Sequence, residues 1–247
     1  MKLGGSLTWK LVGLELLAVL AVAVAGAALF RPIAPPPVSD QVANYTPEPA
    51  PTVRVDGVAV IGESYTAGTP RGGLQGKNWT ELARIAMITP ESEPVLTLSG
   101  RGGSGYVVTG PQGTTFLSEV PNVVRSEAKL VVVSGSRNDM AQPADTVREA
   151  AAATYAAAKL AAPSAKLLVV GVPWVNEQVP ARVSATNDAV AEAAAEAGAT
   201  FVDPLAEGWF FGKAAALIGA DGVHPTDEGH RYLAEKITPH IQAALAS

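Results

Sequence analysis

Four short polar segments of the chain carry the groups that acyl transfer requires. In chain order they are Gly62-Glu63-Ser64-Tyr65, the glycine-rich stretch 100–105, Asn138-Asp139 and Asp221-x-x-His224. A serine supplies a nucleophile, a histidine a general base and an aspartate a group that orients the base. Backbone N–H groups and an asparagine amide can stabilise the oxyanion of the tetrahedral intermediate. These residue types in this order predict a nucleophilic site that acts on an ester or a related acyl group.

The apolar residues are spaced so that the first three polar segments each follow a buried strand. Runs rich in valine and leucine, without polar alternation, predict five strands separated by helices: 53–61, 95–98, 129–133, 166–172 and 200–203. Helices are predicted at 78–88, 144–162 and 184–197, with a last one that begins near Asp227. This pattern is typical of a parallel sheet covered on both faces, a three-layer α/β/α sandwich. The carboxyl ends of its strands meet at one edge, so the polar segments are expected there.

Three of these segments together resemble the SGNH hydrolases, also called the GDSL esterase/lipase family. They are Gly62-Glu63-Ser64-Tyr65, Gly135-x-x-Asn138-Asp139 and Asp221-x-x-His224-Pro225. The resemblance extends from Val53 to Ser247 and implies the flavodoxin-like fold of that family. Two departures stand out. Glu63 occupies the place of the usual aspartate, a change expected to shift hydrogen bonding around the nucleophile, and the glycine-rich stretch lacks the usual asparagine.

The resemblance implies a catalytic triad of Ser64, His224 and Asp221. Ser64 would attack the ester carbonyl, and His224 would take its proton and pass it to the leaving alcohol. Asp221 would accept the other imidazole N–H and so fix the tautomer. The reaction then proceeds through an acyl-enzyme intermediate, and neither a metal nor a cofactor is required.

The resemblance also implies an oxyanion hole. Its donors would be the backbone N–H groups of Ser64 and Gly103 and the side-chain amide of Asn138. The choice of glycine is open among Gly102, Gly103 and Gly105, and Gly103 is the one predicted.

A metal site is a weaker interpretation of the same region. Asp221, His224, Asp227 and His230 are spaced by three residues. Pro225 interrupts a shared helical face, however, and His230 is expected on the surface of the last helix. We therefore predict no metal here.

Composition excludes several other classes of protein. The net charge is −5, and the 18 lysines and arginines form no run, which argues against nucleic-acid binding. With no cysteine, the chain has no disulfide, no thiol nucleophile and no Cys-ligated metal. The stretch 100–105 matches a dinucleotide-binding fingerprint, but no helix is predicted after it.

The first thirty residues predict a signal anchor or a cleaved signal peptide. Lys2 and Lys10 precede the segment 11–30, which is apolar except for Glu15, and Ala25-Gly26-Ala27 is a candidate cleavage site. Residues 31–52 are expected to form a linker, because 31–51 holds seven of the 19 prolines. The catalytic domain would then comprise 53–247. It is expected outside the cytoplasm, either attached to the membrane by a hydrophobic helix or secreted.

This organisation favours a serine esterase that removes acetyl or other short acyl groups, with acylated cell-wall glycans or lipids as expected substrates. An acyltransferase with the same triad and a non-catalytic envelope-binding module are the alternatives. Near the site, Arg101 and Arg137 are candidates for contact with an anionic ester. Several aromatic residues are candidates for contact with sugars or acyl chains, or for packing: Trp174, Trp209, Phe210 and Phe211.

Overall fold

A computed structural model describes residues 54–246, and in this part of the chain five parallel strands form one sheet. The predicted N-terminal segment 1–30 and linker 31–52 lie outside the described residues. Within residues 54–246, no helix is both long and apolar enough to cross a membrane. The strands are ordered β2-β1-β3-β4-β5, the order of the flavodoxin-like doubly wound sheets. Their bounds are β1 (Arg54–Gly62), β2 (Ser92–Gly100), β3 (Leu130–Ser134), β4 (Lys166–Val170) and β5 (Thr200–Val202).

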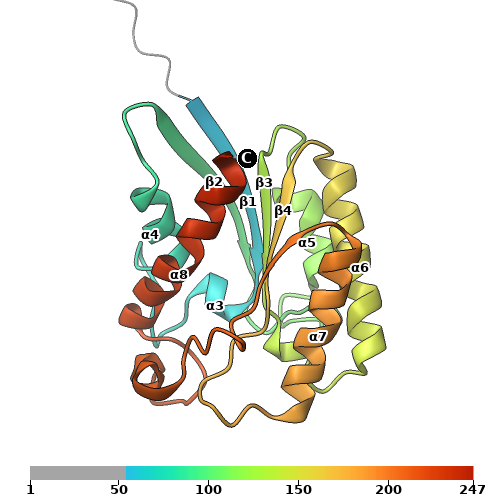
Figure 1. Ribbon diagram of the computed structural model, residues 1–247, viewed down its shortest axis with the longest axis vertical. Coiled ribbons are helices and arrows are strands. Elements are labelled where there is room, and N and C mark those ends of the chain that lie inside the picture. The colour runs from blue at the N-terminus through green and yellow to red at the C-terminus, as the bar shows by residue number, and fades with distance from the viewer. Residues whose placement is uncertain (1–53, 247) are drawn as a thin grey trace, which may run out of the picture. The chain divides into compact units, whose positions relative to one another are not determined.

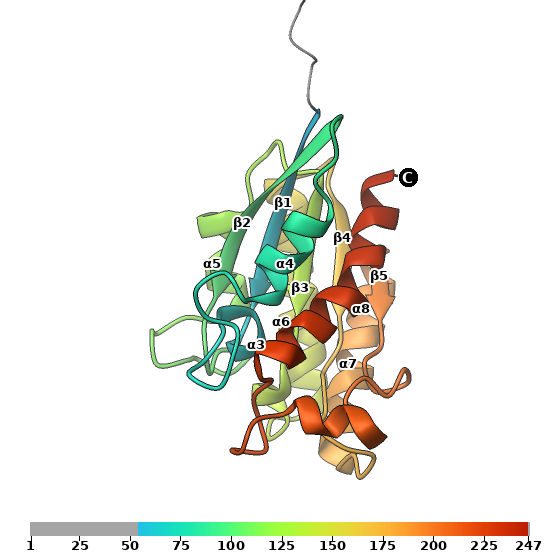
Figure 2. The same cartoon turned by 90° about the vertical axis from the view of Figure 1, so that its left-hand side faces the viewer.

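Helices cover both faces of the sheet, which confirms the predicted three layers (Figure 1). On one face lie α4 (Trp79–Ala86) and α8 (Asp227–Ala246). On the other lie α5 (Phe116–Val123), α6 (Ala144–Ala161) and α7 (Ala181–Glu196). Figure 2 looks onto the face covered by α4 and α8, with the sheet and the helices of the other face behind them.

Successive residues of each central strand enter different hydrophobic cores. In β1, Val58 and Val60 pack toward α4 and α8, whereas Ala59 and Ile61 pack toward α5, α6 and α7. β3 alternates in the same way. A strand buried on both faces needs apolar side chains at every position, which explains the unbroken apolar runs of the sequence.

Among the strands and the longer helices, two differ most from the sequence-based expectation. β2 extends over Ser92–Gly100 rather than 95–98; it lies at the edge of the sheet, and only two of its nine residues are buried. Helix α5 was not predicted, since Pro121 interrupts its helical pattern. Its start is secured by a capping box between Thr115 and Ser118.

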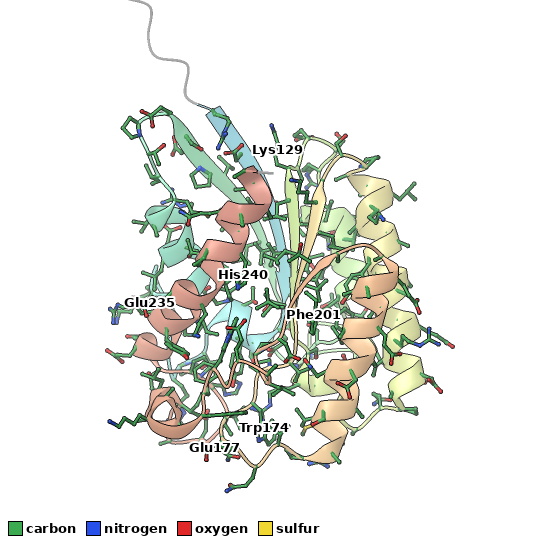
Figure 3. All side chains as sticks on the ribbon, in the orientation of Figure 1. Lys129, Trp174, Glu177, Phe201, Glu235 and His240 are labelled. Atoms are coloured by element: carbon green, nitrogen blue, oxygen red, sulfur yellow. The ribbon has the colours of Figure 1, made fainter. Side chains whose placement is uncertain are left out.

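The segments that follow β1 and β3 lie at one end of the sheet. α3 (Ser64–Ala67) follows β1, and the 3₁₀ helix η1 (Arg137–Asp139) follows β3. α3 packs closely on the end of β2, where a Cβ on Gly100 would lie 2.6 Å from the Ala67 Cα. Figure 3 labels Lys129 at the opposite end of the sheet, where β3 begins, and Trp174 at the end that carries α3.

Leu168 tests the packing of the sheet, since it is fully buried in β4. Leu168→Ala should lower the free energy of unfolding by about 2–5 kcal/mol, because it leaves a cavity that the core fills only in part. Leu160→Ala on α6, where the side chain is 83% exposed, is the matched control and should change it by less than about 0.5 kcal/mol. Urea unfolding monitored by circular dichroism measures both. Equal effects of the two substitutions would contradict the assigned core.

His230 is buried, contrary to the expectation that it lies on the surface of the last helix. The loop before α4 covers it so closely that a Cβ on Gly73 would overlap the imidazole. The Trp79 N–H donates to Nδ1 of His230 at 3.4 Å, and Nε2 has no hydrogen-bond partner among the described residues. Burial lowers the pKa of His230 from 6.5 to about 4, although the nearby Asp227 carboxylate acts in the opposite direction.

The depressed pKa of His230 predicts a loss of stability in acid. The folded protein binds fewer protons at this site than the unfolded chain, so its contribution is complete above pH 6.5 and is lost as the pH falls toward 4. The full effect is about 3 kcal/mol. His230→Gln should flatten the dependence of unfolding free energy on pH between 4 and 6.5, whereas His240→Gln on the same helix should retain it. An unchanged slope in His230→Gln would refute the assignment.

Candidate active site

Ser64 is the first residue of α3, directly after β1, and the preceding glutamate caps this helix. The Glu63 Oε2 atom accepts hydrogen bonds from the Ser64 backbone N–H at 2.5 Å and from the Ser64 hydroxyl at 2.6 Å. It also accepts a longer bond from the Tyr65 N–H at 3.4 Å. The hydroxyl of Ser64, predicted to be the nucleophile, and its backbone N–H, predicted to be an oxyanion donor, therefore both donate to the same carboxylate oxygen.

Glu63 is almost completely buried, and its Oε1 atom has no hydrogen-bond partner among the described residues. Burial raises the pKa of this carboxyl group, and the hydrogen bonds from Ser64 and Tyr65 partly oppose that effect. Within residues 54–246, the Ser64 hydroxyl forms no hydrogen bond with His224. The hydrogen of this hydroxyl points at Glu63.

Asp221 and His224 form the paired arrangement that the sequence predicts. The Asp221 Oδ2 atom lies 2.9 Å from His224 Nδ1, and Oδ1 accepts the backbone N–H groups of Val223 and His224 at 3.0 Å each. The hydrogen bond from the His224 backbone N–H is the largest of the effects that keep the pKa of Asp221 well below its usual range, so this carboxylate remains ionised. A neutral imidazole that donates from Nδ1 presents its unprotonated Nε2 as a base.

The loop that carries His224 lies against α3. The ring of Tyr65, the residue after Ser64, has its centroid 6.4 Å from that of His224. The Tyr65 hydroxyl donates to the Val223 carbonyl oxygen at 2.5 Å. The structure thus brings the predicted base next to the short helix of the predicted nucleophile.

Asn138 and Asp139, at the end of β3, hold the glycine-rich loop. Asn138 Nδ2 donates to the Ser104 carbonyl oxygen at 2.8 Å, which uses one of the two amide hydrogens. The Asp139 carboxylate accepts three backbone N–H groups of the same loop, at 2.7–3.1 Å, from Tyr106, Val107 and Val108. This role of Asp139 was not predicted, because the loop residues that it binds lie more than thirty positions earlier in the chain and no local signal connects them.

The three candidate oxyanion glycines differ in the partners of their N–H groups. The Gly105 N–H donates to the Val108 carbonyl oxygen at 2.9 Å. The N–H groups of Gly102 and Gly103 have no partner among the described residues. Gly102 lies beside Ser64, since a Cβ on Gly102 would be 3.8 Å from the Ser64 Cβ, and Gly103 has a φ of +81°. Gly103 stays a prediction.

The other side chains expected near the site have different surroundings. Arg137 is buried, and its guanidinium carbon lies 4.6 Å from the ring centroid of Trp174, so it is not a solvated surface charge. Arg101 is half exposed and forms an ion pair with Glu119. Trp209 and Phe210 are fully buried in the core on the α8 side, where they serve packing.

No three histidine, aspartate or glutamate side chains of residues 54–246 converge where a metal could bind. Asp227 pairs with Lys77 at 2.6 Å and accepts the Gly73 N–H. A hollow of about 580 Å³ lies between β2, α4 and the loop 73–78, and none of the predicted site residues lines it.

Asp139→Asn should disrupt the glycine-rich loop. An amide can accept on only one side, so at least one of the three N–H groups faces another donor or loses its partner. We expect a loss of about 1–3 kcal/mol in unfolding free energy and faster hydrogen exchange at residues 106–108. Asp188→Asn, on the exposed face of α7, is the control and should leave both unchanged. If the two variants behaved alike, Asp139 would not hold the loop.

The sequence pattern of the GDSL-like Lipase/Acylhydrolase family matches residues 60–232, most of the described domain. The chain is 40% identical over 195 residues to the GDSL lipase Rv0518 of Mycobacterium tuberculosis, covering 78% of this chain and 84% of that protein.

Similar solved structures include TesA, which is 22% identical with a TM-score of 0.63 and covers 77% of this chain and 100% of its own. The esterase EstA from Pseudoalteromonas sp. is 14% identical with a TM-score of 0.59, covering 78% and 100%. Est24, a carbohydrate acetylesterase from Sinorhizobium meliloti, is also 14% identical, with a TM-score of 0.58 and coverage of 76% and 99%. At these identities the three structures establish the shared fold.

Proposed function

The chain belongs to the GDSL-like lipase/acylhydrolase family and is a serine ester hydrolase, and we propose that Ser64, His224 and Asp221 are its catalytic triad. The observation that carries this proposal is the Asp221–His224 pair, 2.9 Å apart, on a loop bound to the residue after Ser64. Of the other two histidines, His230 is enclosed in the core, and His240 lies in α8, thirteen residues after its first residue Asp227 and so about 20 Å further along the helix axis.

The reaction begins when the Ser64 hydroxyl turns from Glu63 to His224. His224 Nε2 takes the hydroxyl proton as Oγ attacks the ester carbonyl, and Asp221 stabilises the imidazolium that results. The tetrahedral intermediate collapses, His224 returns the proton to the leaving alcohol, and Ser64 retains the acyl group. Water, deprotonated by His224, then releases the carboxylic acid and restores Ser64.

The oxyanion is held by donors on two segments. Asn138 contributes the amide hydrogen that is not bonded to Ser104, and Gly103 contributes its N–H. The Ser64 N–H becomes a third donor once Glu63 releases it. Donors that are fixed before charge develops, as Asn138 and Gly103 are in this proposal, stabilise the transition state most effectively.

We infer that the substrates carry acetyl or other short acyl groups, on cell-envelope glycans or lipids. Two features support this inference. The apolar segment 11–30 favours export and attachment to a membrane, where envelope material is the available ester. The related proteins are described as a lipase and a carbohydrate acetylesterase, which span both kinds of substrate.

Hydrolysis of p-nitrophenyl acetate, butyrate and octanoate by the full-length chain tests the proposal. Ser64→Ala should abolish turnover, and Asn138→Ala should lower kcat by about 10²–10³-fold through loss of one oxyanion donor. Asn122→Ala, on the exposed surface of α5, is the matched control and should leave kcat unchanged. Turnover by a folded Ser64→Ala protein would refute the assigned nucleophile.

A fluorophosphonate probe separates the alternatives. Labelling of Ser64 together with ester hydrolysis indicates the esterase. Labelling with product formed only when an acceptor alcohol is added indicates an acyltransferase. No labelling of the folded wild-type chain indicates a binding module and would contradict the proposal.

A further inference from the structure

One main-chain oxygen joins the three segments that carry the proposed site. The Val223 carbonyl, directly before His224, accepts the Tyr65 hydroxyl at 2.5 Å and an Nη1–H of Arg137 at 3.4 Å. Tyr65 follows Ser64 in α3, and Arg137 precedes Asn138 in η1. In the proposed site, the nucleophile Ser64 thus precedes Tyr65, the oxyanion donor Asn138 follows Arg137, and the base follows Val223.

Apart from this junction, the backbone bonds of the loop that carries His224 remain local, and its ion pair to Arg71, 3.4 Å from Asp221, involves a side chain that is 52% exposed. The Gly219 N–H donates to the His224 carbonyl oxygen, and the Thr226 N–H donates to that of Leu217, both at 2.8 Å. These bonds set the shape of the loop without fixing its distance from the sheet. Asp221 and His224 are also about one-quarter exposed, with side-chain accessibilities of 26% and 27%, so packing constrains them only in part.

Both donors are themselves held rigidly. Tyr65 is buried, and its ring packs edge-on against Phe210 with centroids 6.2 Å apart. Burial raises the pKa of Tyr65, so its hydroxyl keeps the hydrogen that it donates. Arg137 is fixed by its stacking on Trp174, a cation–π contact in a largely desolvated position.

We propose that Tyr65, assisted by Arg137, is a positioning residue that holds His224 in register with Ser64 through the Val223 carbonyl. Neither side chain takes part in proton transfer. Their hydrogen bonds set the separation of Nε2 and Oγ, on which proton transfer depends steeply. This inference rests on the proposed triad.

The first test compares Tyr65→Phe with Tyr155→Phe in the full-length chain. The Tyr155 hydroxyl also forms a buried hydrogen bond, with the Tyr106 hydroxyl at 2.7 Å, which Tyr155→Phe removes. Tyr155 lies in the core on the other face of the sheet. Tyr65→Phe should lower kcat for p-nitrophenyl acetate about 10- to 100-fold with little change in KM, because alignment rather than binding is lost. Both substitutions should lower the melting temperature by similar amounts, because each removes one buried hydrogen bond. Tyr155→Phe, however, should leave kcat within about twofold of the wild-type value. Equal kcat values for the two variants would overturn the proposal.

Arg137 provides an independent test should Tyr65→Phe fail to fold. Arg137→Lys keeps a cationic donor beside the Val223 carbonyl, and Arg137→Gln removes the charge. The lysine variant should retain more kcat than the glutamine variant at equal KM. The Tyr65→Phe/Arg137→Gln double variant should lose less than the product of the single effects, since both side chains act on one oxygen. Full additivity, or equal kcat in the two Arg137 variants, would contradict a shared positioning role.

His224→Ala distinguishes failure of this inference from failure of the triad. Retained hydrolysis by His224→Ala would show that His224 is not the general base and would refute the proposed triad. An inactive His224→Ala protein combined with a fully active Tyr65→Phe protein would preserve the triad and refute the positioning role of Tyr65 alone.

Discussion

The burial of a parallel sheet on both faces is the constraint on which the rest of this structure depends. Because α4 and α8 cover one face and α5, α6 and α7 the other, the strand interiors can carry only apolar side chains. Polar chemistry is therefore restricted to the ends of the strands. The carboxyl ends of the strands lead into loops and short helices, and this is where Ser64, Asn138 and the glycine-rich loop come together.

Loops at the end of a sheet have no ladder of hydrogen bonds, and in this protein buried polar side chains supply the missing partners. Glu63 caps α3, Asp139 accepts three N–H groups of the glycine-rich loop, and Tyr65 binds the carbonyl beside His224. A buried polar group is costly unless it is paired, so each of these side chains favours a single loop conformation. The resulting rigidity suits a site whose donors must be in place before charge develops.

The regular elements could be predicted because their signal is local. Apolar runs and turn residues located all five strands and four of the longer helices, with boundaries that moved by a few residues. Where the local signal was weak, prediction was incomplete: Pro121 concealed α5, and the half-exposed edge strand β2 extended beyond its apolar centre. His230 was misplaced because the loop that buries it lies more than 150 residues away in the chain.

By itself the sequence determined the residue types, their order along the chain and the family to which they belong. Tertiary structure decided that the Ser64 hydroxyl points at Glu63, that Gly105 is not a free donor, and that Arg137 is buried on Trp174. These outcomes depend on contacts between distant segments, such as Tyr65 with Val223, 158 positions apart. Local sequence fixes what a side chain can do, whereas its partner is set by which segments the packed sheet brings to the same edge.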